Sequence, residues 1–293
     1  MKISVIGAGN VGASVAYALA LKGLCDELAI IDIFANHAKS KAMDIAQSTQ
    51  VFNLPIKVNG GDNYTLVSKS DIVVMTAGSP RKPGQSREDL LLINAKVLKS
   101  VMENVKTYAP NAILIMVTNP LDVMVYLAQK FTGFKSSKII GMAGELDSAR
   151  LRYEISNLKG DADSKSMVVG AHNDKMIISK NYVKDALSDD EFKNISDDTK
   201  NGGAKFVELV GTSAFYAPAA GAVKLCEAII KDKKELQSVS VILDGFACGR
   251  VASIAKDGIC EIFELNLTQI EQEKLKESQD EIAKNIKFVE ENL

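Results

Sequence analysis

The two histidines of the chain are the first candidates for acid–base chemistry, because the ordinary pKa of histidine lies near neutral pH. His37 lies in a polar stretch and has no predicted chemical role. His172 follows the apolar run Met167–Val169 and precedes Asn173 and Asp174. A single histidine after a strand is more often structural than catalytic, so the groups around it must decide its role.

Two segments supply charges for such a site. Asp147 and Arg150 stand at i and i+3 of a predicted helix, so they share one face of it. The Pro/Gly-rich segment 79–89 carries Arg81 and Arg87. Taken alone, that segment fits either a solvated turn or a cationic binding loop.

A glycine pattern near the start of the chain predicts a nucleotide site. The pattern G-x-G-x-x-G is formed by Gly7-Ala8-Gly9-Asn10-Val11-Gly12, between a predicted strand and a predicted helix. Gly7 permits a tight turn, Gly9 lets a pyrophosphate approach the backbone, and Gly12 lets helix and strand pack closely. The helix N-terminus presents unpaired N–H groups to the phosphates. Alone, the pattern is a weak signal because glycine turns are common.

Asp32 strengthens that interpretation and predicts which cofactor binds. It ends the second predicted strand, about 20 residues beyond the glycine pattern, where a carboxylate can bond the adenosine ribose. An acidic group there repels a 2′-phosphate, and no arginine follows it before Arg81. The sequence therefore predicts NAD rather than NADP. The alternative is a surface aspartate that closes a strand.

The first half of the chain alternates strand and helix patterns, which is typical of a doubly wound parallel sheet. The apolar runs are short and β-branched, as expected for strands covered on both faces. The expected strands are Ile3–Ile6, Leu28–Ile33, Ile56–Val58, Ile72–Met75, Ile113–Val117 and Lys138–Ile140.

After about residue 142 the pattern changes to apolar runs flanked by polar or turn residues, which predict antiparallel hairpins. Ser188-x-x-Glu191 and Thr268-x-x-Glu271 predict two helix N-termini. The sequence thus predicts an α/β protein: a Rossmann domain over 1–141 and an α+β substrate domain with antiparallel strands over 142–293. The runs in this half are Met167–Val169, Met176–Ile178, Val239–Leu243 and Ile259–Phe263.

Composition and charge exclude several classes of protein. The chain has 293 residues, 46% hydrophobic and 25% charged, with a net charge of -2 and no large basic block. This argues against nucleic acid or a membrane surface as a partner, and no apolar stretch reaches the ~20 residues of a membrane span. No signal peptide is predicted. Cys25, Cys226, Cys248 and Cys260 form no close pair and no cluster in the sequence. We therefore expect buried, unpaired thiols in a reducing cytoplasm, and no metal site.

Together the motifs resemble the lactate/malate dehydrogenase family, and within it the malate dehydrogenases. The resemblance covers essentially the whole chain, and the motifs follow in the family's order. The matching segments are Gly7–Gly12, Asp32, Thr76–Gly78, Arg81–Arg87, Asn94, Val117–Asp122, Leu146–Arg150, Gly170–Asp174 and Gly211–Ala220.

The resemblance implies NAD-dependent, reversible hydride transfer between malate and oxaloacetate. His172 is then the general acid and base, and Asp147 accepts the other imidazole N–H. Arg87 polarises the reacting carbonyl, Arg150 clamps the α-carboxylate, and Asn119 bonds the substrate oxygen. The cofactor residues are then Gly7, Gly9, Asn10, Val11, Gly12 and Asp32, with Asn94, Val117 and Asn119 on the nicotinamide side.

The choice of substrate depends mainly on Arg81. Lactate dehydrogenases typically have glutamine at this position, facing a methyl group. An arginine can pair with the second carboxylate of oxaloacetate, and burying that carboxylate unpaired costs several kcal/mol. The resemblance therefore implies a small dicarboxylate substrate, and a loop that closes over it as a lid.

The chain departs from the family at Asn173, where glycine usually follows the catalytic histidine. If this position requires a positive φ, asparagine is among the non-glycine residues best able to adopt it.

Two alternative functions remain: a lactate dehydrogenase, and a catalytically silent NAD-binding protein. A reductase with a Tyr-Lys pair is not supported, because the fourth residue after Tyr153 is Asn157. Members of the family are commonly dimers or tetramers, and the sequence does not choose between them.

Overall fold

The structure, a computed structural model, describes residues 1–79, 86–163 and 165–293. The strands assigned within them are β1 (Lys2–Ile6), β2 (Glu27–Ile31), β3 (Lys57–Gly61), β4 (Ile72–Met75), β5 (Ile113–Met116), β6 (Ile139–Gly141), β7 (Glu235–Leu243), β8 (Phe246–Ala255) and β9 (Gly258–Ile262). They form one sheet in the order β3-β2-β1-β4-β5-β6-β7-β8-β9. The pairs from β3 to β6 are parallel, and those from β6 to β9 are antiparallel.

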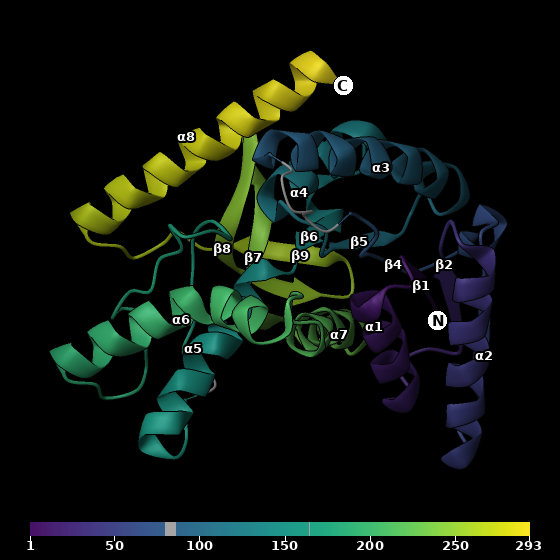
Figure 1. Cartoon of the computed structure of the whole chain (residues 1–293), viewed down its shortest axis with the longest axis horizontal. Coiled ribbons are helices and arrows are strands. Elements are labelled where there is room, and N and C mark those ends of the chain that lie inside the picture. The colour runs from purple at the N-terminus through teal and green to yellow at the C-terminus, as the bar shows by residue number, and fades with distance from the viewer. Residues whose placement is uncertain (80–85, 164) are drawn as a thin grey trace.

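Helices cover both faces of this sheet (Figure 1). The helices of one face are α1 (Asn10–Leu21), α2 (Ala35–Val51) and α7 (Tyr216–Ile230), and those of the other are α3 (Arg87–Tyr108), α4 (Leu121–Thr132) and α8 (Gln269–Asn292). Further along, α5 (Ala143–Lys159) contacts both α6 (Asp189–Val210) and β7. Two short 3-10 helices are η1 (Tyr64–Val67) and η2 (Ser136–Lys138).

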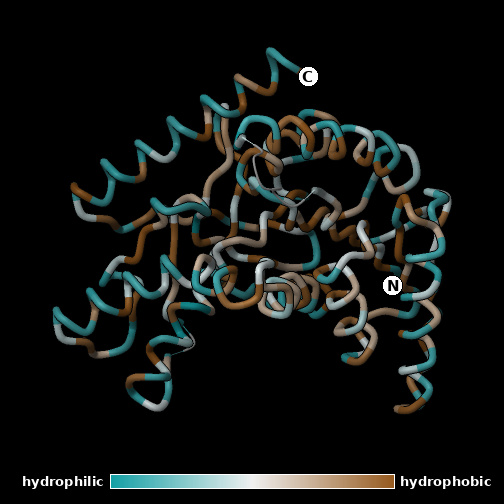
Figure 2. Tube along the Cα trace, viewed as in Figure 1, coloured by the Kyte–Doolittle hydropathy of each residue, from teal (hydrophilic) through white to brown (hydrophobic). Residues whose placement is uncertain are grey.

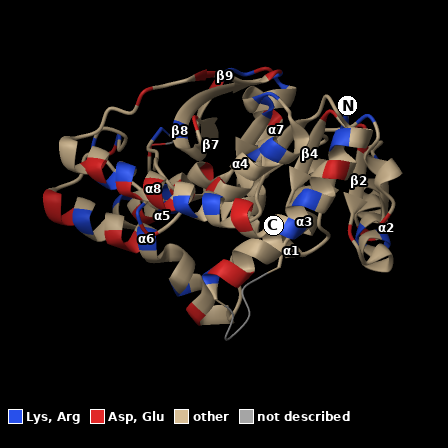
Figure 3. Ribbon diagram, turned by 90° about the horizontal axis from the view of Figure 1, so that it is seen from above, with Lys and Arg blue, Asp and Glu red and all other residues tan. Residues whose placement is uncertain are grey.

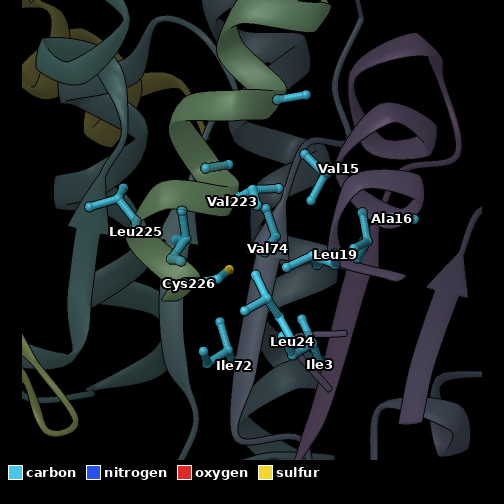
Figure 4. Close-up of a cluster of buried hydrophobic side chains, with 14 of the residues drawn as sticks. Ile3, Val15, Ala16, Leu19, Leu24, Ile72, Val74, Val223, Leu225 and Cys226 are labelled. Carbon is cyan, nitrogen blue, oxygen red and sulfur yellow. The ribbon is translucent and has the colours of Figure 1, made fainter. Parts of the chain in front are cut away.

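The two faces of the sheet have separate apolar cores. Figure 4 shows one of them, where Val15 and Leu19 of α1 meet Val223 and Cys226 of α7 over β1 and β4. All four side chains are at most 3% exposed. Fully burying an aliphatic side chain of this size contributes about 1.5–3 kcal/mol. This packing holds α1, and with it the glycine loop, against the ends of the strands.

The outer surface is polar and carries charges of both signs. Figure 2 shows hydrophilic segments along α6 and α8, and Figure 3 shows acidic and basic residues interspersed along the ribbons of the same helices. Among the described residues, no helix has the length and apolarity required to cross a membrane.

The structure confirms the predicted α/β class and its parallel strands. Each of the six predicted N-terminal runs overlaps a strand, with ends that differ by up to three residues. Both predicted capping boxes, at Ser188 and at Thr268, are present. The predicted division at residue 141 remains a prediction, because the sheet runs on from β6 to β7 through the pair Gly141–Ser240.

The second half differs from the prediction in two ways. The runs Met167–Val169 and Met176–Ile178 do not form strands; they share one isolated bridge between Val169 and Ile177. The longest strand, β8, was not predicted, because Gly249, Arg250 and Ser253 interrupt its apolar residues.

The four cysteines differ in exposure. Cys25, Cys226 and Cys248 are buried and unpaired, as predicted, whereas Cys260 is exposed. Burial raises the pKa of the Cys25 thiol to about 11 and that of Cys248 to about 12, so both are protonated near neutral pH.

Candidate active site

The glycine loop between β1 and α1 has the geometry of a phosphate cradle. Gly7 has a φ of +102°, and a Cβ there would lie 2.7 Å from the Ala77 nitrogen. A Cβ at Gly12 would lie 1.9 Å from the Gly7 carbonyl oxygen, so only glycine lets α1 pack this closely. A Cβ at Gly9 would meet nothing within 4 Å. Space at Gly9, beside the unpaired N–H groups that begin α1, fits a pyrophosphate.

Asp32 is fixed beside this loop at the end of β2. Its Oδ2 accepts a hydrogen bond from the Ala8 N–H at 2.7 Å, and its Oδ1 accepts one from the Phe34 N–H at 3.0 Å. Each carboxylate oxygen has a second lone pair for a ribose hydroxyl. The glycine loop and Asp32, predicted as parts of one site, therefore lie together, and the residues fit a dinucleotide.

His172 and Asp147 form a hydrogen-bonded pair. The histidine Nδ1 lies 2.7 Å from Asp147 Oδ2, although the two residues are 25 positions apart. Asp147 is buried, and the His172 side chain is 16% exposed. A carboxylate can only accept, so Nδ1 carries the hydrogen and Nε2 remains for chemistry. This is the arrangement of an oriented acid–base group.

The electrostatics of the pair favour the protonated imidazole. Burial lowers the pKa of His172, but the charge and hydrogen bond of Asp147, together with the charge of Asp122, outweigh it. The pKa of His172 therefore lies above its ordinary value. The histidine keeps its proton to higher pH than free histidine, which suits a proton donor.

Arg150 joins the same cluster from α5. Its guanidinium donates to Asp147 Oδ1 at 3.2 Å, so Asp147 holds the arginine with one oxygen and the histidine with the other. Arg150, His172 and Asn119 line a cavity of about 180 Å³, together with Val11 and Val117. The cavity thus brings together a proton donor, a cation and the end of the glycine loop.

A second cavity, of about 660 Å³, opens on the other side of His172 and Asn119. Arg87, the first residue of α3, lines it and is exposed. Arg87 is therefore within the walls of the histidine site, as the resemblance implied. Arg81, on which the substrate prediction depends, lies outside the described residues.

Asn94 is buried and its side-chain amide bonds within the protein. Its Oδ1 accepts from the Ser79 N–H at 2.7 Å, and its Nδ2 donates to the Asn119 carbonyl oxygen at 2.8 Å. These bonds give Asn94 a role in holding Asn119 in place. Direct contact of Asn94 with a nicotinamide stays a prediction.

Within the described ranges, no group of three or more His, Cys, Asp or Glu side chains is arranged to hold a metal ion. The cluster of His172, Asp147 and Arg150 instead has the composition of a site for proton transfer to an anionic molecule.

Family models match nearly the whole chain. The NAD binding domain of lactate/malate dehydrogenase matches residues 1–141, and the alpha/beta C-terminal domain of the same family matches residues 144–293. The chain belongs to the lactate/malate dehydrogenase family. Its members are oxidoreductases, and the match to the NAD binding domain makes NAD the cofactor.

The chain is similar over its full length to curated and solved members of this family. A malate dehydrogenase of Nitratiruptor sp. is 39% identical, over 99% of this chain and 96% of the relative. A malate dehydrogenase of Cryptosporidium parvum has a TM-score of 0.91 at 37% identity, with 99% of each chain covered. A lactate dehydrogenase of the same organism, solved with lactic acid and NAD, has a TM-score of 0.93 at 36% identity, covering 100% and 98%. Fold alone therefore does not distinguish the two activities.

Several residues at this site were given no role from the sequence. Ser213 and Pro218 line the smaller cavity, and they belong to the matching segment Gly211–Ala220, which had been given no role. Asp122 accepts a hydrogen bond from the His172 backbone, and it ends the matching segment Val117–Asp122. In both cases the motif was visible in the sequence but the direction of the side chains was not.

Asn173 does not have a positive φ, so its backbone conformation carries no strain that glycine would relieve. Its Oδ1 accepts from the Lys175 N–H at 2.8 Å, a local bond that stabilises the turn after the histidine.

Replacing Asn173 with glycine is therefore expected to leave kcat nearly unchanged. The substitution loses the bond to Lys175 and adds backbone freedom to the unfolded chain, which together lower the free energy of unfolding by about 1 kcal/mol. Steady-state kinetics and thermal unfolding of Asn173→Gly measure both effects. A large gain in kcat would mean that asparagine strains the site after all.

Proposed function

We propose that this chain is an NAD-dependent malate dehydrogenase, in which His172 is the proton donor and acceptor. The observation that carries the proposal is the Asp147 carboxylate, which bonds His172 with one oxygen and Arg150 with the other. This shared carboxylate supports His172 as the acid–base group and Arg150 as the anion-binding group of one cavity. The 39–41% identity to several malate dehydrogenases supports the same activity.

In the direction of carbonyl reduction, the protonated His172 donates its Nε2 proton to the carbonyl oxygen of oxaloacetate. Arg87 polarises that carbonyl, and Arg150 binds the α-carboxylate with its planar fork. Asp147 stabilises the imidazolium before the transfer and keeps the neutral tautomer afterwards. Bound NADH supplies the hydride, and bound NAD accepts it in the reverse reaction. Malate oxidation returns the proton to His172.

In our proposal, one domain binds the cofactor and the other supplies the acid–base group. Residues 1–141 hold the cofactor at the glycine loop and Asp32, with Asn10, Val11, Val117 and Asn119 along its path. Residues 142–293 supply the histidine, its aspartate and Arg150. We propose Arg81 as the residue that pairs with the second carboxylate, which makes a small dicarboxylate the substrate.

The proposal predicts strong NADH-dependent turnover of oxaloacetate and little turnover of pyruvate. Loss of NADH absorbance is followed with each acid, and each assay is repeated with NADPH. Asp32 should make NADPH a poor substitute, because two negative charges repel at the ribose. This assay tests the substrate and the cofactor together.

Each other outcome favours a different function. Preference for pyruvate would support a lactate dehydrogenase, the activity named for one of the similar solved structures. Binding of NADH without turnover of either acid would favour a silent NAD-binding protein. Equal use of NADPH would contradict the role of Asp32.

We further propose that the chain forms a homodimer or homotetramer in the cytoplasm. Large apolar side chains are exposed on α2 and α6, where a second copy could cover them. Light scattering of the purified chain measures the oligomeric state. The most exposed of these side chains are Met43, Val51, Leu209 and Val210.

A further inference from the structure

A buried carboxylate on α4 contacts the backbone of the proposed catalytic histidine. Asp122, the second residue of the helix, is 5% exposed. Its Oδ2 accepts a hydrogen bond from the His172 N–H at 2.9 Å. A buried carboxylate is costly unless it is fully hydrogen-bonded. The hydrogen bonds of the Asp122 carboxylate therefore fix its position, and they show which groups it holds in place.

The other oxygen of this carboxylate is bonded by the sheet. Ser240 on β7 is 1% exposed, and its hydroxyl donates to Asp122 Oδ1 at 2.6 Å. The position of Ser240 is set by strand register, because it pairs with Gly141 of β6 and with Gly249 of β8. The Ser240 hydroxyl thus connects the sheet to His172 through the Asp122 carboxylate.

The segment that carries His172 needs such a link, because it has little regular structure of its own. Its backbone is held near the histidine by the isolated bridges of Val169 with Ile177 and of Gly170 with Gly249. The imidazole is held by Asp147 on α5. Asp122 is the contact that fixes the backbone of the histidine itself.

We propose that Asp122 and Ser240 are positioning residues for proton transfer: Ser240 orients the Asp122 carboxylate, and that carboxylate fixes the backbone of His172 opposite Asp147. Small displacements of a reacting group cost large factors in rate. Burial raises the pKa of the Asp122 carboxyl above its ordinary value, and in its ionised form its charge adds to that of Asp147 in stabilising the imidazolium. The inference rests on the proposed role of His172 as the acid–base group.

Substitutions at positions 122 and 240 leave all other charged residues near His172 in the sequence. Arg150 on α5 opposes the two aspartates, and Cys248 on β8 is neutral because burial raises its pKa to about 12. The remaining charged groups on the walls of the larger cavity are Arg87 and Glu88 on α3, Asp174, and Glu281 and Lys284 on α8.

The test uses the fact that the chain has only two histidines. In the full-length protein labelled with ¹³C-histidine, NMR follows the titration of His172, while the exposed His37 serves as an internal reference. Asp122→Asn keeps an oxygen for the His172 N–H but removes the charge. We expect the midpoint of His172 to fall by on the order of one pH unit.

Kinetics provide the second measurement. Asp122→Asn is expected to lower kcat for oxaloacetate roughly ten- to a hundredfold, with NADH affinity unchanged, and to move the alkaline loss of activity to lower pH. Ser240→Ala keeps the carboxylate and should give a smaller loss of kcat. Because Ser240 acts through Asp122, the double variant should be no slower than Asp122→Asn alone.

Ser238→Ala is the matched control. Ser238 is buried on the same strand and donates a hydrogen bond to the Val168 carbonyl, not to Asp122. Thermal unfolding of Ser238→Ala and of Ser240→Ala reports the loss of one buried hydrogen bond in each. In Ser238→Ala, the midpoint of His172 should stay at its native value.

A purely structural role, in which Asp122 only favours the N-terminus of α4, predicts a different pattern. Stability would then fall in the variants, while kcat and the midpoint of His172 stayed unchanged. That pattern, or additive losses in the double variant, overturns the inference. It leaves the proposed function intact, because that function is tested by turnover of the native chain.

Discussion

His172→Asn is expected to bind NADH with unchanged affinity and to reduce oxaloacetate several orders of magnitude more slowly than the native chain. Asparagine can occupy a similar volume and accept or donate a hydrogen bond, but it cannot deliver a proton near neutral pH. The lost proton leaves negative charge building on the carbonyl oxygen with only cationic side chains to stabilise it. The loss should therefore appear in kcat.

Fluorescence titration with NADH and single-turnover kinetics separate binding from chemistry in this variant. The residual rate should also lose the alkaline decline that the titration of His172 gives the native chain. His37→Asn is the control, since His37 is exposed on α2 and is not among the residues that line the two described cavities. Retained turnover in His172→Asn would remove the acid–base role, and equal losses in both variants would point to general damage.

The parallel strands of the sheet could be predicted because the apolar pattern within each run indicates a strand without reference to distant residues. Runs such as Ile72–Met75 are wholly buried, so they are apolar at every position, and this pattern occurs in few other elements. The capping boxes at Ser188 and Thr268 are equally local, because donor and acceptor stand three residues apart.

The hairpin expected around residues 167–178 is reduced to one antiparallel pair, in which Val169 and Ile177 exchange both backbone hydrogen bonds. The backbone N–H of Val168 donates to the Ser148 hydroxyl, and its carbonyl accepts from the Ser238 hydroxyl. The backbone groups of Val168 point away from Ile177 in this pairing, and side chains of α5 and β7 satisfy them. The apolar pattern of residues 167–178 does not indicate such distant hydrogen-bond partners.

The same limit applies to the site. The resemblance pointed to His172, Asp147 and Arg150 because they lie in family motifs, and the structure brings these three together. Asp122 and Ser240 meet across 118 positions of sequence. Their contact depends on the register of β7 against β6, which is set by the packing of the whole sheet.

Arg81→Gln is expected to change the substrate preference of the chain by about a hundredfold to a thousandfold towards pyruvate. In the native chain, the proposed partner of the second carboxylate of oxaloacetate is a guanidinium, which bonds a carboxylate with two parallel N–H groups. Glutamine offers one neutral amide, so the carboxylate would be buried without a counter-charge. The methyl group of pyruvate carries no such penalty. The ratio of kcat/KM for oxaloacetate to that for pyruvate, with NADH in excess, measures the change.

The neighbouring Lys82→Gln gives a control with the same loss of net charge in the same segment. If Arg81 pairs directly with the second carboxylate, only Arg81→Gln changes the ratio, and its largest effect falls on oxaloacetate. If both variants lower kcat/KM for oxaloacetate equally, and the size of that loss depends on ionic strength, the segment attracts the dianion through its overall electrostatic field. An unchanged ratio in Arg81→Gln would refute the role of Arg81, and substrate choice would then have to come from residues around the two described cavities. The comparison therefore separates a specific ion pair at Arg81 from a general cationic loop.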